Sequence, residues 1–247
     1  MGFFNKMRFP GERPASTLPS SRGGTSAAAA GAPGLSSAPA RASQPSGDIR
    51  VSNGLKEFLW NLDGLGHGSL LDLGPVWQST ITFFVERGFK VYADDLLRDW
   101  KQFATAEDER MRKIQPGEDA SEMTPESRAD RFLQSNIKYP RDNFDGILLW
   151  DLLDYMDRAL VKRFAEHLSD MLRPGGVIFA MFHMGKPESF YRYRILDRQT
   201  LELIASPALF SIQRSYQNRE IQDLFPVFRT SKSFVGRDQL REVLFVK

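Results

Sequence analysis

The sequence predicts an α/β fold built on a mostly parallel sheet, and three observations support this. From residue 51 onwards, apolar segments of strand length alternate with segments of helical periodicity. Residues 69–95 read as a strand, a turn at Gly74, a helix and a second strand that ends in two carboxylates, the order of a nucleotide-binding βαβ unit. The chain closes with two strand-like segments, 229–235 and 242–246, whose short connection makes them antiparallel.

The composition fits one folded domain. Of 247 residues, 41% are hydrophobic, which is enough for a buried core. Cysteine is absent, which excludes disulfides, thiolate metal sites and cysteine nucleophiles. The three histidines lie far apart in sequence, so we expect no metal site. No apolar run approaches the ~18 residues of a membrane helix, and no signal peptide is visible, so we expect a cytoplasmic protein.

The first fifth of the chain predicts no packed structure. Residues 11–48 are mostly Ser, Ala, Gly and Pro, and they lack the apolar side chains that would offset the entropy of ordering. We therefore expect a disordered tail over 1–48 and a folded domain over 49–247. Residues 1–10 hold three Phe among basic side chains, and two interpretations stay open: a docking segment for a protein partner, or an unengaged tail.

The charge distribution argues against nucleic acid as a partner. Residues 1–50 carry six basic and two acidic side chains, whereas the whole chain has a formal net charge of +2. The remainder is therefore slightly acidic, and it predicts no basic surface for nucleic acid.

Local patterns predict the elements in order. Ser52 and Asn53 can cap a helix in which Leu55 and Phe58 begin an apolar stripe. Next we expect, in this order, a strand at 69–73, a helix at about 79–87, a strand at 90–93, a helix at 96–113, a short strand at 131–135 and a strand at 145–149.

The second half of the chain continues this alternation and then departs from it. Leucine and phenylalanine four residues apart predict a helix from 160 to 172, which ends at a Pro-Gly-Gly sequence. The apolar run 177–182 predicts a strand at the centre of a parallel sheet. A β-hairpin is expected at about 190–205, followed by a helix from Asn218 to Phe225 and the two terminal strands.

Four segments, in this order, resemble the motifs of class I S-adenosylmethionine-dependent methyltransferases. They are LLDLG at 70–74, GFKVYADD at 88–95, FDGILLWDLLDYM at 144–156 and LRPGGVIFAMF at 172–182. The resemblance covers about four-fifths of the chain. It implies a Rossmann-like seven-stranded sheet with an antiparallel last strand and helices on both faces. It also implies S-adenosylmethionine as cofactor and methyl transfer to an acceptor, small molecule or protein, that the sequence does not identify.

The glycine turn departs from the family pattern, which is usually GxGxG. Gly74 is present, but Val76 and Gln78 stand at the next two glycine positions. A left-handed conformation costs a non-glycine residue roughly 1–2 kcal/mol, so we expect a different loop path, helped by Pro75. The alternative function is a non-catalytic relative of the fold that binds or scaffolds. A nicotinamide dehydrogenase would need a GxGxxG turn, which this turn lacks.

The resemblance places the cofactor at Asp72, Gly74, Asp95 and Asn136. Asp95 falls at the position of the ribose-binding acid, and Asp94 is its rival because a shift of one residue exchanges the two. Asp72 lies inside an apolar strand and needs hydrogen-bond partners there, whether it orders the turn or meets the ligand. Ser135 and Asn136 fall where the family often has an acid near the adenine.

Asp151 and His183 are the candidates for a general base. Asp151 follows one predicted strand and His183 ends another, at the sheet edge where ligands bind in such folds. Histidine suits proton transfer near pH 7. A helix cap at Asp151 and an incidental His183 remain open. The alternating Tyr and Arg residues at 191–194 predict a hairpin over the carboxyl end of the sheet, either a lid or an edge with solvated arginines.

Overall fold

The computed structural model describes residues 47–113, 124–187, 189–228, 230–236 and 238–247. The segment 1–10 lies outside these ranges. So does the predicted tail over 1–48, apart from its last two residues, of which Asp48 already begins a strand.

The main sheet confirms the predicted fold class. Its strands lie in the order β3–β2–β4–β5–β9–β8. Their bounds are Gly68–Asp72 for β2, Phe89–Ala93 for β3, Phe144–Trp150 for β4, Leu172–His183 for β5, Thr230–Val235 for β8 and Leu240–Val246 for β9. The first four pair in parallel, and β9, the last strand of the chain, runs antiparallel to both of its neighbours. The sheet is therefore mixed and mostly parallel, with its reversed strand last.

The sheet has six strands in the described part of the chain instead of the predicted seven. The segment 131–135, predicted as a strand, lies inside helix α4 (Pro125–Asn136). Ala129, Phe132 and Leu133 are buried at helical spacing, and Thr124 caps the helix by accepting a hydrogen bond from the Ser127 backbone N–H. The short apolar run at 131–135 is one face of this helix.

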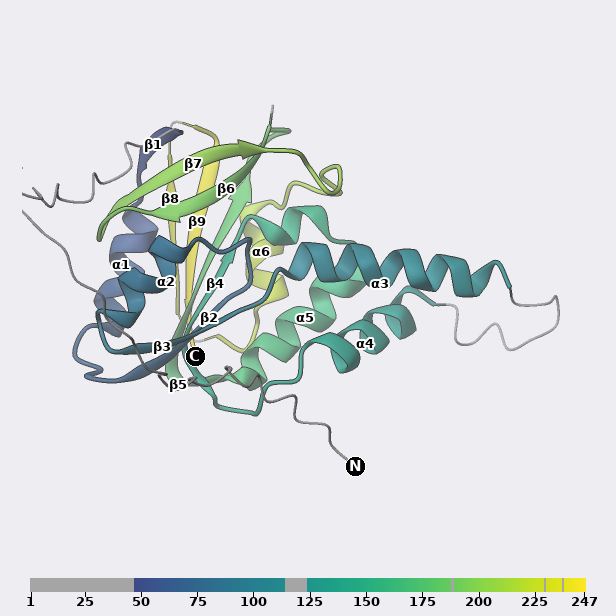
Figure 1. Ribbon diagram of the computed structural model, residues 1–247, viewed down its shortest axis with the longest axis horizontal. Coiled ribbons are helices and arrows are strands. Elements are labelled where there is room, and N and C mark those ends of the chain that lie inside the picture. The colour runs from purple at the N-terminus through teal and green to yellow at the C-terminus, as the bar shows by residue number, and fades with distance from the viewer. Residues whose placement is uncertain (1–46, 114–123, 188, 229, 237) are drawn as a thin grey trace, which may run out of the picture. The chain divides into compact units, whose positions relative to one another are not determined.

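Helices cover both faces of the sheet (Figure 1). One face packs against α3 (Leu96–Met111), α4, α5 (Arg158–Met171) and α6 (Asn218–Leu224) in a large apolar cluster. The other face packs against α1 (Asn53–Leu62), α2 (Gln78–Val85) and a small second sheet. Ser52 caps α1 as predicted, with its side chain accepting from the Leu55 N–H.

The small sheet has the order β1–β7–β6 and contains the predicted hairpin, formed by β6 (Phe190–Ile195) and β7 (Thr200–Ser206). Its third strand, β1 (Asp48–Val51), is not predicted from sequence. Arg50 in β1 donates from Nη2 to the buried Glu242 of β9 at 2.9 Å. The Gly47 N–H donates to Glu202 of β7 at 2.9 Å. These bonds tie β1 to both sheets.

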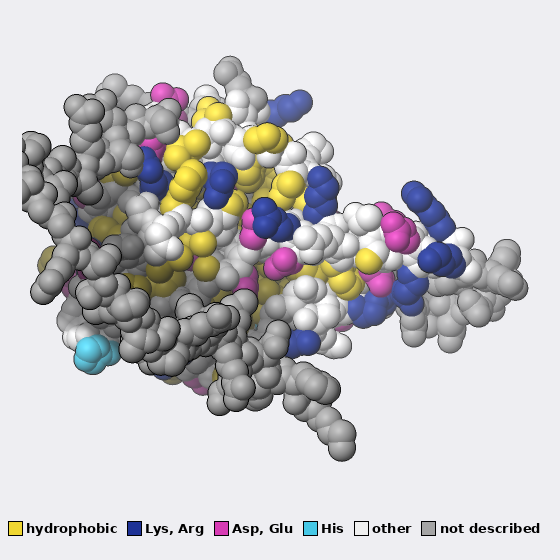
Figure 2. Space-filling view, viewed as in Figure 1, with side chains coloured by type: hydrophobic (Ala, Val, Ile, Leu, Met, Phe, Trp, Pro, Cys, Tyr) yellow, Lys and Arg dark blue, Asp and Glu magenta, His cyan; other side chains and the backbone are white. Residues whose placement is uncertain are grey.

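The long helices carry mixed charges. Acidic and basic side chains are interspersed along α3 and α4 on the face shown in Figure 2. Several pair with one another, including Arg131 with Glu107 at 2.5 Å and Arg128 with Asp108 at 3.0 Å. No helix within the described ranges is long and apolar enough to cross a membrane.

Candidate functional site at the carboxyl edge of the sheet

The strand order reverses between β2 and β4, since β2 leads outward to β3 and β4 leads outward to β5 in the opposite direction. In open α/β sheets, ligands bind outside the carboxyl ends of the strands at such a switch point. Here Asp72 ends β2, Gly74 follows it, and Trp150 ends β4. The site is therefore built around the glycine turn and the end of β4.

The Trp150 indole fills the crevice beside the glycine turn. It is 3% exposed, and a Cβ atom at Gly74 would lie only 2.4 Å from its Cδ1. Its Nε1–H donates to Asp72 Oδ1 at 2.8 Å, and its ring stacks on Tyr193 with centroids 5.4 Å apart. Its backbone has a φ of 52°, a left-handed conformation that is costly for a bulky residue. Glycine at 74 therefore makes room for this indole.

Asp72 is buried and orders the turn. One of its oxygens, Oδ1, accepts from the Trp150 indole and from the Gly74 backbone N–H at 3.0 Å. Burial raises the pKa of Asp72 to about 7, and these two hydrogen bonds only partly oppose that effect. In this structure Asp72 therefore makes the contacts expected of a residue that orders the glycine turn.

A cavity of about 400 Å³, which we call the turn cavity, opens beside the carboxyl ends of β2 and β3. The glycine turn, the end of β3 and the hairpin contribute its lining. The lining residues are Gly74, Pro75, Val76, Ala93, Asp94, Asp95, Arg98, Phe190, Arg192, Ser206, Pro207 and Leu209. The hairpin therefore borders the carboxyl edge of the sheet, as the sequence predicts.

Both rival carboxylates line the turn cavity. Asp95 caps α3, with Oδ1 accepting from the Arg98 N–H at 3.2 Å. Asp94 Oδ2 accepts from the Tyr139 hydroxyl at 2.6 Å. Asn136 is not brought to this cavity, because its side-chain amide donates to the Phe132 carbonyl within α4. Its role beside an adenine stays a prediction.

The turn accommodates its two non-glycine residues without left-handed backbone. In the described ranges, the non-glycine residues with positive φ are Asp142, Trp150 and Gln239, so neither Val76 nor Gln78 is among them. Gln78 opens α2, preceded by Trp77 in an extended conformation. The guanidinium of Arg192 lies 4.4 Å from the centre of the Trp77 ring, which adds a cation–π contact between hairpin and turn.

The two predicted general bases meet in a buried cluster with Asp154 and Tyr193. His183 Nδ1 lies 3.1 Å from Asp154 Oδ2, and the same oxygen accepts from the His183 backbone N–H at 2.6 Å. His183 Nε2 lies 3.7 Å from Asp151 Oδ2, which accepts from the Tyr193 hydroxyl at 3.0 Å. Asp154 belongs to the short 3₁₀ helix η2 (Leu152–Tyr155) after β4.

Burial and charge shift the pKa values of this cluster. Burial raises the pKa of Asp151 to about 7, although the neighbouring His183 opposes this shift. Burial alone lowers the pKa of His183, but its hydrogen bond to Asp154 and the charges of Asp151 and Asp154 outweigh burial and raise it. Such a cluster can accept or release a proton at physiological pH.

His183 also lines a second cavity of about 520 Å³, which we call the His183 cavity. The lining comes from β1, the segment after β5, the hairpin and the start of β9. The lining residues are Asp48, Ile49, Arg50, His183, Gly185, Lys186, Pro187, Tyr191, Leu203, Asp238, Gln239 and Leu240. Sequence reasoning missed the contribution of β1, since four residues after a Ser/Ala/Gly/Pro-rich stretch carry no signal for it.

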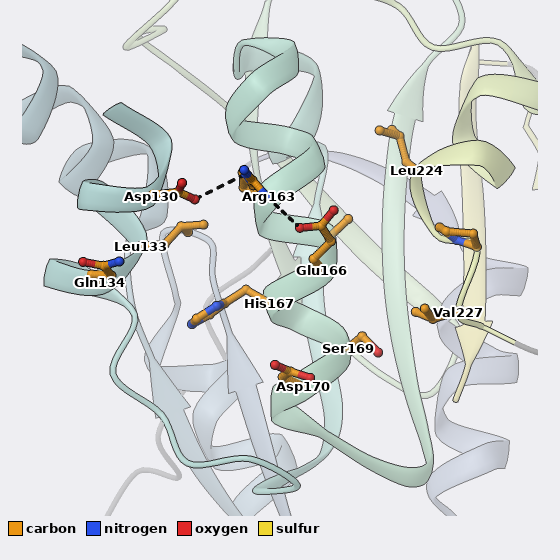
Figure 3. A pocket seen from close by; sticks show the side chains of 12 residues that line it. Asp130, Leu133, Gln134, Arg163, Glu166, His167, Ser169, Asp170, Leu224 and Val227 are labelled. Atoms are coloured by element: carbon orange, nitrogen blue, oxygen red, sulfur yellow. Dashed lines mark hydrogen bonds and ion pairs between the residues drawn. The ribbon is translucent and has the colours of Figure 1, made fainter. Parts of the chain in front are cut away.

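A third cavity, of about 440 Å³, lies between α4, α5 and the residues that follow α6 (Figure 3). Arg163 in this cavity pairs with Asp130 at 3.3 Å and with Glu166 at 3.4 Å. His167 lines this third cavity, whose lining does not include Asp151 or Asp154 of the buried cluster. No group of three or more His, Asp or Glu side chains in the described segments is arranged to hold a metal ion.

Comparison with known proteins finds solved methyltransferases of low similarity to this chain. The 1,6-didemethyltoxoflavin N1-methyltransferase of Burkholderia thailandensis, solved with S-adenosylhomocysteine, is 16% identical with a TM-score of 0.43, covering 78% of this chain and 76% of that chain. A methyltransferase from Mesorhizobium loti is 14% identical with a TM-score of 0.45, covering 77% and 96%. No family model and no curated protein matches the sequence.

Proposed function

We propose that the protein binds S-adenosylmethionine in the turn cavity and transfers its methyl group to an acceptor. The turn cavity is the observation that carries this proposal. It offers about 400 Å³ at the carboxyl ends of β2 and β3, between the glycine turn and two carboxylates. The acid after the second strand of a βαβ unit is placed to accept hydrogen bonds from two ribose hydroxyls.

The residues of the turn cavity would divide the work of binding. Asp95 accepts hydrogen bonds from the ribose, with Asp94 as the neighbouring alternative. The backbone of the 74–76 turn approaches the ligand closely because Gly74 has no side chain. The protein then mainly aligns the acceptor with the methyl group, since orientation supplies a large share of the barrier lowering in such a displacement.

Trp150 favours a second candidate function, a non-catalytic binding protein of the same fold. Its indole occupies the crevice beside Gly74 and is held by a hydrogen bond to Asp72 and by the stack on Tyr193. A ligand that extends from the turn cavity across the switch point must displace this indole. If the indole never moves, the turn cavity can hold a ligand but cannot present it to an acceptor beyond β4.

Titration calorimetry with S-adenosylhomocysteine tests the proposal. We expect saturable binding by the full chain and a ~10- to 100-fold weaker affinity for Asp95→Ser, because bonds to a charged acceptor contribute ~1.5–3 kcal/mol. Serine keeps the cap of α3, so this variant separates ribose binding from helix stability better than alanine. Asp99→Asn, an acid of α3 outside the cavity lining, is the matched control and should bind normally.

Two outcomes would change the assignment. If Asp94→Ala weakens binding and Asp95→Ser does not, Asp94 is the ribose acceptor. If the wild-type chain shows no saturable binding at millimolar ligand, methyl transfer in the turn cavity is wrong, and the non-catalytic function replaces it.

A further inference from the structure

We propose that the His183 cavity binds the methyl acceptor, that this acceptor is a hydroxyl compound such as a phenol, and that His183 takes the proton of its hydroxyl group. The proposal rests on the proposed function, since the methyl group comes from the cofactor assigned there. It assigns His183 as the base, Asp154 as the residue that positions it, and the acceptor as an oxygen nucleophile.

The hydrogen bonds of His183 fix which ring nitrogen is the base. His183 Nδ1 lies 3.1 Å from Asp154 Oδ2, and we assign the hydrogen of the neutral ring to Nδ1 because a carboxylate oxygen accepts. Nε2 then has a free lone pair, and its distance of 3.7 Å from Asp151 Oδ2 is too long for a hydrogen bond. An imidazole oriented by a buried carboxylate through Nδ1 is the arrangement in which Nε2 acts as a general base.

The burial of Asp154 shows that this carboxylate serves the imidazole. Asp154 is fully buried, and its Oδ2 is engaged twice by His183, once through the ring and once through the backbone. Its other oxygen, Oδ1, is buried without a hydrogen-bond partner. A buried carboxylate with these contacts stabilises the imidazolium that forms when Nε2 accepts a proton.

The lining of the His183 cavity is mixed. Ile49, Pro187, Tyr191, Leu203 and Leu240 supply the apolar part of its walls. Arg50 lines the cavity too, but its guanidinium is engaged by Glu242 and Asp238 and is not free to pair with an anionic ligand. Asp48, Lys186 and Asp238 also line the cavity, and all three are solvent-exposed. A buried base beside walls of mixed polarity suits a hydroxyl compound such as a phenol.

The proposed step balances. The acceptor O–H bond breaks and its proton passes to His183 Nε2. An oxygen lone pair forms the new bond to the methyl carbon, while the carbon–sulfur bond breaks and its electron pair stays on sulfur. The products are a methyl ether, S-adenosylhomocysteine and protonated His183. A neutral amine would attack through its own lone pair and would not need a base held in this way beforehand.

The Trp150 indole lies between one residue of the turn cavity and the buried cluster around His183. It packs on Gly74, which lines the turn cavity, and stacks on Tyr193, whose hydroxyl donates to Asp151 beside His183. On this proposal, the two ligands meet when the indole turns away. The left-handed backbone of Trp150 is a strained conformation, and strain of this kind clusters at ligand sites and switch regions.

Binding of 4-nitrophenol to the full chain tests the acceptor site, because its ionised form absorbs visible light and its neutral form does not. At a fixed pH, we expect saturable binding with a rise in phenolate absorbance. His183→Gln should lose at least ~10-fold of that bound phenolate signal. Asp154→Asn should keep binding but lower the ionised fraction, a readout that a merely structural role would not move. His167→Gln, in the third cavity, is the matched control and should behave as wild type.

S-Adenosylhomocysteine titrated into the same preparations separates the two proposals. If it binds and 4-nitrophenol does not, or if His183→Gln keeps the full phenolate signal with an unchanged melting temperature, the acceptor site is wrong and the cofactor site stands. If 4-nitrophenol binds and S-adenosylhomocysteine does not, methyl transfer is wrong, and the acceptor assignment fails with it.

Discussion

At the scale of single residues, the crevice is governed by the pair Asp72 and Trp150. A carboxyl group in an apolar strand is stable only with hydrogen-bond partners, and Trp150 and the turn supply them. The indole in turn depends on Asp72, because its buried N–H would otherwise lack an acceptor. The two residues therefore hold one another in place at the switch point of the sheet.

Replacing Asp72 by Asn should change the pH dependence of stability. The unfolded side chain loses its proton near pH 3.8 and the folded one near 7, so the folded state binds more protons between these values. The free energy of unfolding of the wild type therefore falls as pH rises from about 4 to about 7. Asn keeps the acceptor oxygen and does not ionise, so the variant lacks this contribution.

Denaturant unfolding at pH 4.5 and pH 8 measures the effect. We expect the variant to gain ~2–4 kcal/mol relative to wild type between the two pH values. Asp63→Asn, a side chain about half exposed and paired with Arg198, is the control and should shift little. A difference between Asp72→Asn and wild type that is the same at both pH values would contradict the raised pKa.

At the scale of elements, the helices and strands that are marked by a local sequence pattern were predictable. The strands at 69–73, 90–93, 145–149 and 177–182 were found because buried parallel strands are short apolar runs between turns, and the structure shifts mainly their ends. The prediction of a strand at 131–135 was wrong, because five residues are too few to distinguish a strand from one face of a helix. Its helical signals, Thr124 and Pro125, lie a full two turns upstream.

The cap of α4 gives a direct test of this correction. Thr124→Ala removes the acceptor for the Ser127 N–H and should cost ~1 kcal/mol of unfolding free energy. Thr124→Ser keeps the hydroxyl and should stay close to wild type. Circular dichroism during denaturant unfolding measures both. Equal stability of the alanine and serine variants would argue that α4 does not begin at this cap.

The candidate site was only half predictable for a related reason. Asp151 and His183 follow from strand ends, because the carboxyl ends of parallel strands lie at one edge. Tertiary packing decides how close the side chains of Asp151 and His183 come. It also decides the hydrogen bond between Asp151 and Tyr193, which lies 42 residues later in the hairpin. The position of the Trp150 indole in the crevice depends on the left-handed backbone of that residue. Nothing about a tryptophan in a sequence predicts this conformation.

At the scale of the whole molecule, β1 joins the two sheets. Arg50 reaches Glu242 in the main sheet, and the Gly47 backbone reaches Glu202 in the small sheet. Glu242 is buried and Arg50 is its ion-pair partner, so removing Arg50 leaves this charge behind in the interior. The stability of the domain should therefore depend on where the chain is shortened.

Two truncations test this dependence by thermal melting. A chain that starts at Gly47 should melt within a few degrees of the full chain, because the segment it loses has the composition of a tail. A chain that starts at Ser52 lacks β1 and should melt about 10 °C lower or more, since an unpaired buried charge costs roughly 3–5 kcal/mol. Arg50→Leu in the full chain isolates the ion pair. Equal melting of the two truncated chains would show that β1 is dispensable.

The position of Trp150 also makes the crevice visible in fluorescence. The chain has four tryptophans, and Trp150 is 3% exposed whereas Trp60 is 71% exposed. An indole moved from an apolar stack into water emits at longer wavelength. A ligand that displaces Trp150 should therefore shift the emission of the protein to the red, and a ligand that stops at the turn cavity should leave it unchanged. The shift should vanish in Trp150→Phe, so the colour of the emitted light reports whether the two cavities have been connected.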